Sequence, residues 1–409
     1  MGFCLTENKK GMTMVEMLVV IIIISILFAS FFYIWNTMDI FRKSRDSKRI
    51  NDLQIIDTAL KTILTTEKNI NLGQENVIYT SLPDSSSTCG SYNLIPVYAP
   101  YSYRCQTSDN YLKIDGNGWL PVNFTLGKIL TISVLPIDPL NNKDYFYAYQ
   151  VRGGRYKLSA RFESKANINK MANDGGFELT LYEVGSDLFI PSPQSGLVGY
   201  WNFDETGTIA RDLSGYNNNG TMYSSTIITD LHTTTSCKIG LCANFDGVDD
   251  YVYVGNSYIL QITSDLTILM WLYPTNITKG RQNPLGKAYG GEYMFTLETN
   301  GNLSFFQGSC GGNCSPYGYN SNAPYGMTNN NWYFVGIRRI NARQRMDHFK
   351  NGSKINDGSY SWVNPSVSSN AVRIGREYAG YFQGLIDEVR IYNRALSDQE
   401  IKVLYEVTK

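Results

Sequence analysis

Residue types that commonly carry out catalysis are sparse in this 409-residue sequence. It contains two histidines, His232 and His348, which stand far apart. A Ser/His/Asp set or a histidine-built metal centre is therefore not expected. Two acidic pairs, Asp249-Asp250 and Asp387-Glu388, lie in strand-like stretches, where adjacent side chains point to opposite faces. Because neither pair can face one substrate bond together, the sequence predicts a protein that is not an enzyme.

Cysteines offer a second kind of chemistry. Cys4 lies near the N-terminus, and the other six form three couples that are close in sequence: Cys89 with Cys105, Cys237 with Cys242, and Cys310 with Cys314. An even number of thiols in an exported chain favours disulfides, so we expect three local bridges. A structural zinc site built from the four thiols of the last two couples is the alternative.

A long stretch after Cys310 combines aromatic rings with amides. It offers three tyrosines and two asparagines: Tyr317, Tyr319, Tyr325, Asn320 and Asn322. Rings that stack on sugar faces, beside amides that bond hydroxyl groups, are typical of a site for a glycan or a flat protein surface. The alternative is a loop that packs only on itself.

The N-terminal segment contains the element that is expected to anchor the chain. Lys9 and Lys10 precede Gly11, and an almost unbroken apolar run follows from Met17 to Trp35. The length predicts a membrane-spanning helix over residues 12–35, with the basic end in the cytoplasm. Glu16 is unusual there, because a carboxylate within a membrane segment is costly and usually functional. An ordinary signal anchor would carry this glutamate by accident, and a cleaved secretory signal would have a shorter apolar run.

This stretch resembles the class III signal of type IV prepilins and pseudopilins. The resemblance implies that a prepilin peptidase removes residues 1–11 by cutting after Gly11, and that the new N-terminus, Met12, is methylated. It also implies that Glu16 pairs with the α-amino group of a neighbouring subunit, which removes the cost of the buried charge. Other pilin subunits, the peptidase and the membrane before assembly are the partners expected.

The helix is expected to continue over 12–71, since the first proline is Pro83 and the first glycine after Gly11 is Gly73. Basic residues cluster beyond the apolar run and are expected to form a solvated helix face or to bind anionic groups: Arg42, Lys43, Arg45, Lys48 and Arg49. Residues 72–184 contain strand-like runs at 111–114, 145–151 and 155–161, which predict a small antiparallel sheet. The turn at Asp115 could hold Ca²⁺ or be purely structural. Residues 185–196, rich in Pro, Ser and Gly, are expected to form a linker.

Residues 197–409 show regularly spaced strand-like runs with Asn-Gly turns, which is typical of one all-β domain. Four motifs in this block resemble laminin-G-like, concanavalin-type jelly-roll domains: 199–205, 212–220, 245–252 and 384–397. The fold expected for the chain is therefore an α+β pilin part, with a long α-helix and a small antiparallel sheet, followed by an all-β jelly-roll sandwich. Ser397 to Glu400 forms a capping box that predicts a short C-terminal helix.

The second resemblance also bears on ligands. Some members of that family bind Ca²⁺ near strand ends, and Asp212, Asn217 and Asp387 are the oxygen donors expected to do so here. No cofactor is expected to be required beyond this possible Ca²⁺. The E-x-D-x-x-E arrangement of one hydrolase family on this fold is absent from the sequence.

Together these features predict a pilin-like subunit, minor or at the filament tip, that displays a lectin-like sandwich for adhesion or ligand binding. It is expected in the cytoplasmic membrane, N-terminus inside, before assembly and on the pilus surface afterwards. The alternatives are a pseudopilin of a type II secretion or DNA-uptake system, and a membrane-anchored carbohydrate-active enzyme. No nucleic-acid partner is expected, since 36 basic residues balance 36 acidic ones.

Overall fold

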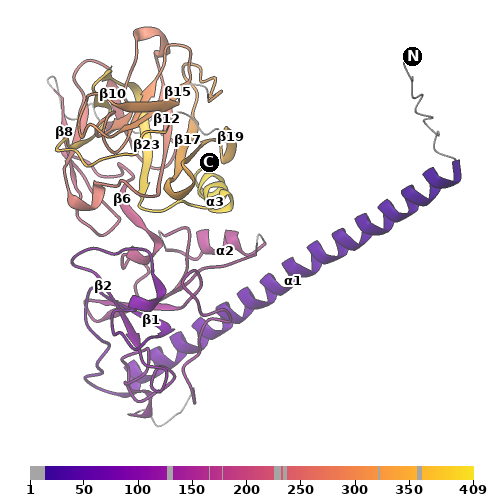
Figure 1. The fold of residues 1–409 in the computed structure, drawn as a ribbon. Coiled ribbons are helices and arrows are strands. Elements are labelled where there is room, and N and C mark those ends of the chain that lie inside the picture. The colour runs from indigo at the N-terminus through magenta and orange to yellow at the C-terminus, as the bar shows by residue number, and fades with distance from the viewer. Residues whose placement is uncertain are drawn as a thin grey trace.

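The computed structural model describes residues 14–126, 132–164, 166–176, 178–224, 232–233, 237–320, 323–356 and 362–409. The expected leader, with Gly11, and the expected N-terminal Met12 lie outside the described residues, as does Asn322. A long helix projects from a small mixed domain, on which a larger β-sandwich sits (Figure 1).

The long helix α1 (Met14–Thr66) is continuous over 53 residues. No glycine or proline interrupts this stretch, so every backbone amide can stay in the helical ladder. Only its C-terminal part packs on the small sheet, through Leu53, Ile56 and Leu60, each completely buried. Within the described residues, no helical stretch is both long enough and apolar enough to cross a membrane. The span over 12–35 therefore stays a prediction.

The small domain contains one five-stranded sheet in the order β2-β1-β3-β4-β5. Its strands are β1 (Val77–Pro83), β2 (Ser102–Gln106), β3 (Ala148–Arg152), β4 (Arg155–Ala160) and β5 (Tyr182–Gly185). The sheet is antiparallel except for β1 and β2, which run parallel. The strand expected at 111–114 is wrong, because the chain turns there and its backbone bonds to residues 107–110.

Buried charges fix α1 to the small domain. Arg49 is fully buried, and its guanidinium lies 2.6 Å from Asp138, 2.8 Å from Asp46 and 2.6 Å from Glu163. Asp46 also accepts hydrogen bonds from the backbone amides of Glu163 and Ser164. Part of the basic cluster expected on a solvated helix face is therefore an internal network.

Two eight-stranded sheets form the sandwich. The first runs β19-β18-β17-β12-β23-β10-β9, with β6 also paired to β23. Its strands are β6 (Leu197–Trp201), β9 (His232–Thr233), β10 (Cys242–Asp246), β12 (Leu266–Pro274), β17 (Tyr333–Ile340), β18 (Arg345–Lys350), β19 (Ser353–Asn356) and β23 (Gln383–Tyr392).

The second sheet runs β16-β15-β14-β13-β20-β11-β8-β7. Its strands are β7 (Ile209–Ala210), β8 (Gly220–Tyr223), β11 (Tyr251–Gly255), β13 (Leu285–Gly286), β14 (Met294–Leu297), β15 (Leu303–Gly308), β16 (Tyr317–Asn320) and β20 (Val372–Ile374). Apolar side chains from both sheets meet in one core, for example Ile268 and Ile337 from the first and Phe295 and Val372 from the second.

The C-terminal helix α3 (Asp398–Thr408) covers the outer face of the first sheet. Its capping box is present as expected, with Ser397 and Glu400 each bonding the other's backbone amide. On its other side, Val403 and Val407 pack against Phe162 and Met171 of the small domain, near the short helix α2 (Ile168–Ala172). The helix therefore lies between the two domains (Figure 1).

The segment expected as a linker, 185–196, is packed rather than exposed. Ile190, Ser192 and Gln194 in it are buried, and Gln194 donates a hydrogen bond to the Gln150 side chain in β3. A glycine- and serine-rich composition predicts irregular backbone, but it does not show whether that backbone is covered by neighbouring domains.

The six cysteines form three disulfides, Cys89–Cys105, Cys237–Cys242 and Cys310–Cys314. These are the sequence-local couples expected. The alternative zinc site is not formed, since its four thiols are taken up in two separate bridges.

Candidate functional site

Two of the tyrosines expected to bind a ligand lie side by side at a sheet edge. Tyr317 and Tyr319 belong to β16, the outermost strand of the second sheet. Residues two apart in a strand share a face, so both rings stand on the same side. Tyr319 is opposite Phe306 of β15, whereas Tyr317 is opposite Gly308, which leaves room beside its ring.

These rings join three others to form what we call the aromatic shelf: Tyr289, Phe306, Tyr317, Tyr319 and Tyr378. Ring centroids are 5.0 Å apart for Tyr289 and Tyr317, 4.9 Å for Tyr289 and Tyr378, and 5.3 Å for the stacked pair Phe306 and Tyr319. Phe306 is buried beneath the others, but Tyr317, Tyr319 and Tyr378 are 43%, 52% and 66% exposed. The shelf is therefore a supported aromatic surface open to solvent.

The loop that carries the shelf is held at its root. The Cys310–Cys314 disulfide closes it, Gly290 pairs with Gly312 in an isolated bridge, and Asn313 Oδ1 accepts a 3.1 Å hydrogen bond from the Tyr289 amide. Arg281 lies over the Phe306 ring at 5.4 Å and is paired with Glu298. Preformed rings lose little conformational freedom when a ligand binds, which favours affinity.

Burial, together with the neighbouring Tyr378 hydroxyl, raises the pKa of Tyr289 above its usual value. The Tyr289 hydroxyl therefore stays protonated at neutral pH, when it can donate a hydrogen bond. Faces of exposed tyrosine rings suit the C–H faces of a sugar, and their hydroxyls can bond to sugar oxygens. The arrangement is therefore suited to binding a sugar by ring stacking and hydrogen bonding.

Tyr325 does not belong to the shelf, so the expectation that it contacts a ligand is wrong. It is completely buried, and its hydroxyl donates to the Gly336 carbonyl at 3.0 Å and lies 3.1 Å from His348 Nδ1. The chain has already re-entered the core at this point, where Ala323 is also fully buried. Asn320 belongs to β16, but its side chain lies outside the described residues.

The sequence did not indicate Tyr289, Phe306 or Tyr378 as partners of the loop. Phe306 lies in β15, the strand that pairs with β16, whereas Tyr289 and Tyr378 lie in connections between strands that are further away along the chain. Tyr378 gave one local signal, since an aromatic residue in a short connection between Gly375 and Gly380 has little opportunity to be buried.

Asp212 and Asn217, two of the three residues expected to hold Ca²⁺, shape a turn. The Asp212 carboxylate accepts hydrogen bonds from the amides of Tyr200, Ser214 and Asn218, and Asn217 adopts a left-handed φ of 58°. Asx-type turns of this kind need no cation.

Asp387 is the third of these residues. It accepts a 3.0 Å hydrogen bond from the Ile239 amide, and burial raises its pKa to about 8. Among the described residues, the one group of three or more acidic side chains whose oxygens converge includes neither Asp212 nor Asp387.

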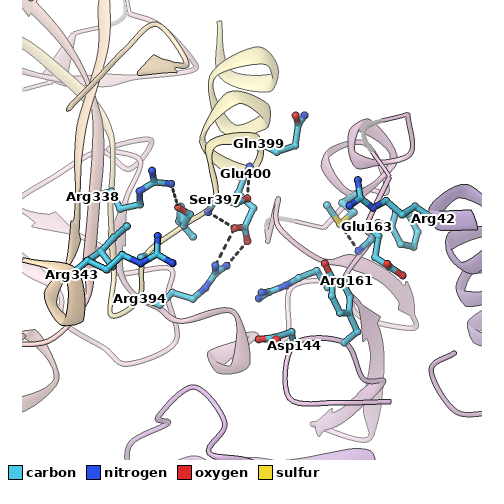
Figure 2. A pocket seen from close by; sticks show the side chains of 16 residues that line it. Arg42, Asp144, Arg161, Glu163, Arg338, Arg343, Arg394, Ser397, Gln399 and Glu400 are labelled. Atoms are coloured by element: carbon cyan, nitrogen blue, oxygen red, sulfur yellow. Dashed lines mark hydrogen bonds and ion pairs between the residues drawn. The ribbon is translucent and has the colours of Figure 1, made fainter. Parts of the chain in front are cut away.

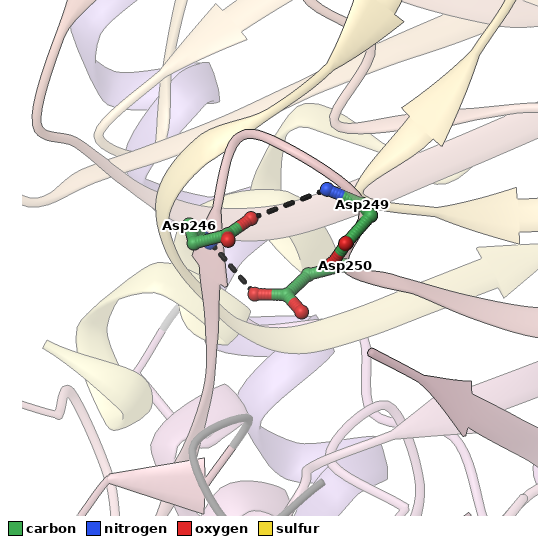
Figure 3. A group of neighbouring side chains, drawn as sticks. All are labelled: Asp246, Asp249 and Asp250. Carbon is green, nitrogen blue, oxygen red and sulfur yellow. Dashed lines mark hydrogen bonds between the residues drawn. The ribbon is translucent and has the colours of Figure 1, made fainter. Parts of the chain in front are cut away.

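Three other carboxylates do come together, at the turn between β10 and β11. Asp246, Asp249 and Asp250 each offer an oxygen within 4.8 Å of the others (Figure 3). Asp246 accepts from the Val248 amide at 2.6 Å, and Asp250 accepts from the Asp246 amide at 2.8 Å. Among the described residues, Asp250 Oδ1 is buried without a hydrogen-bond partner. The group has the oxygen donors that Ca²⁺ prefers.

Comparisons with known families bear on both ends of the chain. Residues 7–32 match the family described as the prokaryotic N-terminal methylation motif. Residues 246–402 match the concanavalin A-like lectin/glucanases superfamily. The chain joins a prepilin-type N-terminus to a concanavalin A-like domain. Both resemblances inferred from the sequence are thereby confirmed, as is the fold class of helix, small sheet and jelly-roll sandwich.

Solved structures show more distant likeness. Domain 4 of AbnA, a GH43 extracellular arabinanase from Geobacillus stearothermophilus solved with arabinotriose, is 17% identical over 52% of this chain and 98% of that chain, with a TM-score of 0.40. The binding domain of Paraclostridial Mosquitocidal Protein 1 is 18% identical over 52% of each chain, with a TM-score of 0.41. No curated protein matched the sequence.

Proposed function

We propose that the protein is a pilin-like subunit that assembles through α1 and presents its concanavalin A-like domain at the cell surface to bind carbohydrate. The observation that carries this proposal is the pairing of a prepilin-type N-terminus with an open aromatic shelf on the attached sandwich. The first feature supplies a route to the surface, and the second supplies a ligand-binding chemistry there.

The shelf suits a glycan better than a deep-pocket ligand. Its exposed rings lie along one sheet edge and are supported from below by Phe306, so they offer a flat surface on which sugar rings can stack. Three of the five shelf rings belong to β15 and β16, and β15 lies on the part of the sandwich remote from the small sheet (Figure 1). A ligand there would not have to displace either α1 or the small domain.

A minor or tip position is the finer part of this proposal. A sandwich of about 210 residues on each subunit would be awkward to repeat along a closely packed filament, whereas a tip has no such crowding. A pseudopilin that uses the sandwich to bind cargo, and an anchored carbohydrate-active enzyme, are the competing functions. Cleavage of a glycan by the purified chain would favour the enzyme.

The shelf is tested by glycan-array binding of the whole chain in detergent. We expect Tyr317→Ala and Tyr319→Ala each to weaken the affinity for a bound glycan about tenfold or more, as loss of a hot-spot ring typically does. Tyr253→Ala is the matched control, since Tyr253 is 41% exposed on the same sheet but outside the shelf. Equal binding by all variants would contradict the shelf, and binding to no glycan would contradict the proposed function.

A further inference from the structure

A cavity of about 720 Å³ lies between the small domain and the sandwich. The small domain contributes Arg161 and Glu163 from the segment just after β4, and the sandwich contributes Arg338, Arg394 and Glu400 (Figure 2). Both domains therefore face one space, and none of the residues of the aromatic shelf lines it.

The charges that line the cavity are predominantly positive. Five arginines, Arg42, Arg161, Arg338, Arg343 and Arg394, face three carboxylates, Asp144, Glu163 and Glu400. Two of these carboxylates already form salt bridges with arginines. Glu163 is paired with Arg45 and Arg49 at 2.6 Å each, and Glu400 is paired with Arg394 at 2.6 Å. Arg338 likewise forms salt bridges with Asp347 and Asp398.

Three cations remain without a salt bridge in the part of the chain that the structure describes: Arg42, Arg161 and Arg343. The remaining carboxylate, Asp144, is exposed and cannot balance all three. The cavity therefore keeps a surplus of positive charge.

Among these residues, Arg161 gives the clearest evidence that the cavity binds an anion. Its Nε is buried and has no hydrogen-bond partner among the described residues, and its guanidinium extends toward Arg394 and Glu400 (Figure 2). Burial and the like charge of Arg394 lower its pKa. A buried guanidinium N–H without an acceptor is costly unless an anion satisfies it, and the nearby Glu400 carboxylate is already paired with Arg394.

We propose that this interdomain cavity is an oxyanion-binding site that takes a small ligand bearing a carboxylate or phosphate group, held by Arg161, Arg343 and the outer edge of Arg394. The planar guanidinium fork matches carboxylate and phosphate oxygens in a bidentate manner. The volume is in the range of small-molecule pockets and accommodates an acidic monosaccharide or a sugar phosphate. Because Arg161 belongs to one domain and Arg343 to the other, a bound anion would bridge them.

Calorimetric titration of the whole chain in detergent tests the site, with glucuronate and inorganic phosphate as separate probes and glucose as the uncharged control. We expect at least one anion to bind and glucose not to bind. Arg161→Gln and Arg343→Gln should each weaken that binding at least tenfold. Arg155→Gln replaces an exposed arginine outside the cavity, in β4, the strand that precedes Arg161, and should leave binding unchanged.

The two probes identify the source of the oxyanion, since a site for acidic sugars prefers glucuronate and a site for phosphorylated ligands prefers phosphate. Arg343 is exposed, so Arg343→Gln keeps the test valid if Arg161→Gln does not fold. Absence of binding by both anions, or binding that neither substitution weakens, would overturn the site. The aromatic shelf is independent of it, because Arg161→Gln should leave glycan binding at Tyr317 and Tyr319 intact.

Discussion

Arg49 shows why a cluster of basic residues in a sequence is hard to interpret one residue at a time. Arg49 stands four residues before Leu53 and seven before Ile56, on the helix face that is buried, whereas Lys48 beside it is exposed. Arg49 pairs with Asp138 and Glu163, which lie far along the chain. Helical spacing therefore indicates which member of the cluster is buried, but only the fold brings these carboxylates to the helix.

Replacing Arg49 should test this network. Arg49→Met leaves the buried carboxylates of Asp138 and Asp46 without their cation, so we expect unfolding free energy to fall by about 3–5 kcal/mol. Urea denaturation of the whole chain in detergent measures it. Lys61→Met, which removes an exposed cation paired with Asp57 on the same helix, should change stability by less than about 1 kcal/mol. Similar losses for both variants would mean that burial does not set the cost.

The aromatic shelf was predictable only in part, for the same reason. Tyr317 and Tyr319 alternate in a strand-like stretch next to a short cysteine couple, so their exposure on one face follows from local pattern. Tyr325 lies in the same stretch of tyrosines and asparagines, but it fills the core beside His348. Composition does not tell where a loop ends and a buried segment begins.

Among the elements, α1 and α3 followed most directly from sequence. An absence of glycine and proline predicts a continuous helix, and a capping box predicts where a helix starts; both signals are local. The sheet of the small domain followed less well. Residues 111–114 have strand-like composition but pair with no strand among the described residues, whereas the parallel pairing of β1 with β2 depends on a long connection.

Glu400, at the start of α3, should make the stability of the fold depend on pH. Burial would raise the pKa of Glu400, but Arg394 and Arg161 outweigh it and lower the pKa to about 2. The side chain of a glutamate in an unfolded chain has a pKa of about 4.3. The stabilisation is therefore fully present above that pH and is lost as the pH falls toward 2.

Denaturation midpoints of the wild type and Glu400→Gln, measured between pH 7 and pH 3, should converge as the solution becomes acidic. Glu406→Gln is the control, because Glu406 lies on the same helix in an exposed pair with Lys409. A difference between the wild type and Glu400→Gln that stays constant across this range would contradict the role assigned to the carboxylate.

At the scale of the whole molecule, the sandwich and the small domain are closely joined. The Tyr101 hydroxyl donates to the Gly215 carbonyl at 3.1 Å, the Asn393 amide donates to the Pro96 carbonyl at 3.2 Å, and α3 packs against the small domain through Val403. The N-terminal part of α1, in contrast, projects from this body and exposes apolar side chains such as Leu18 and Ile21 (Figure 1). An apolar surface of this kind requires a membrane or neighbouring subunits to cover it.

We propose that the projecting helix assembles into a filament through Glu16. Immunogold microscopy and sheared-filament analysis test this in cells that express the wild type, Glu16→Ala or the control Glu67→Ala, since Glu67 lies just beyond the end of α1. We expect Glu16→Ala to reach the membrane fraction but to be absent from filaments, whereas the wild type and Glu67→Ala should be found in them. Normal incorporation of Glu16→Ala into filaments would contradict it.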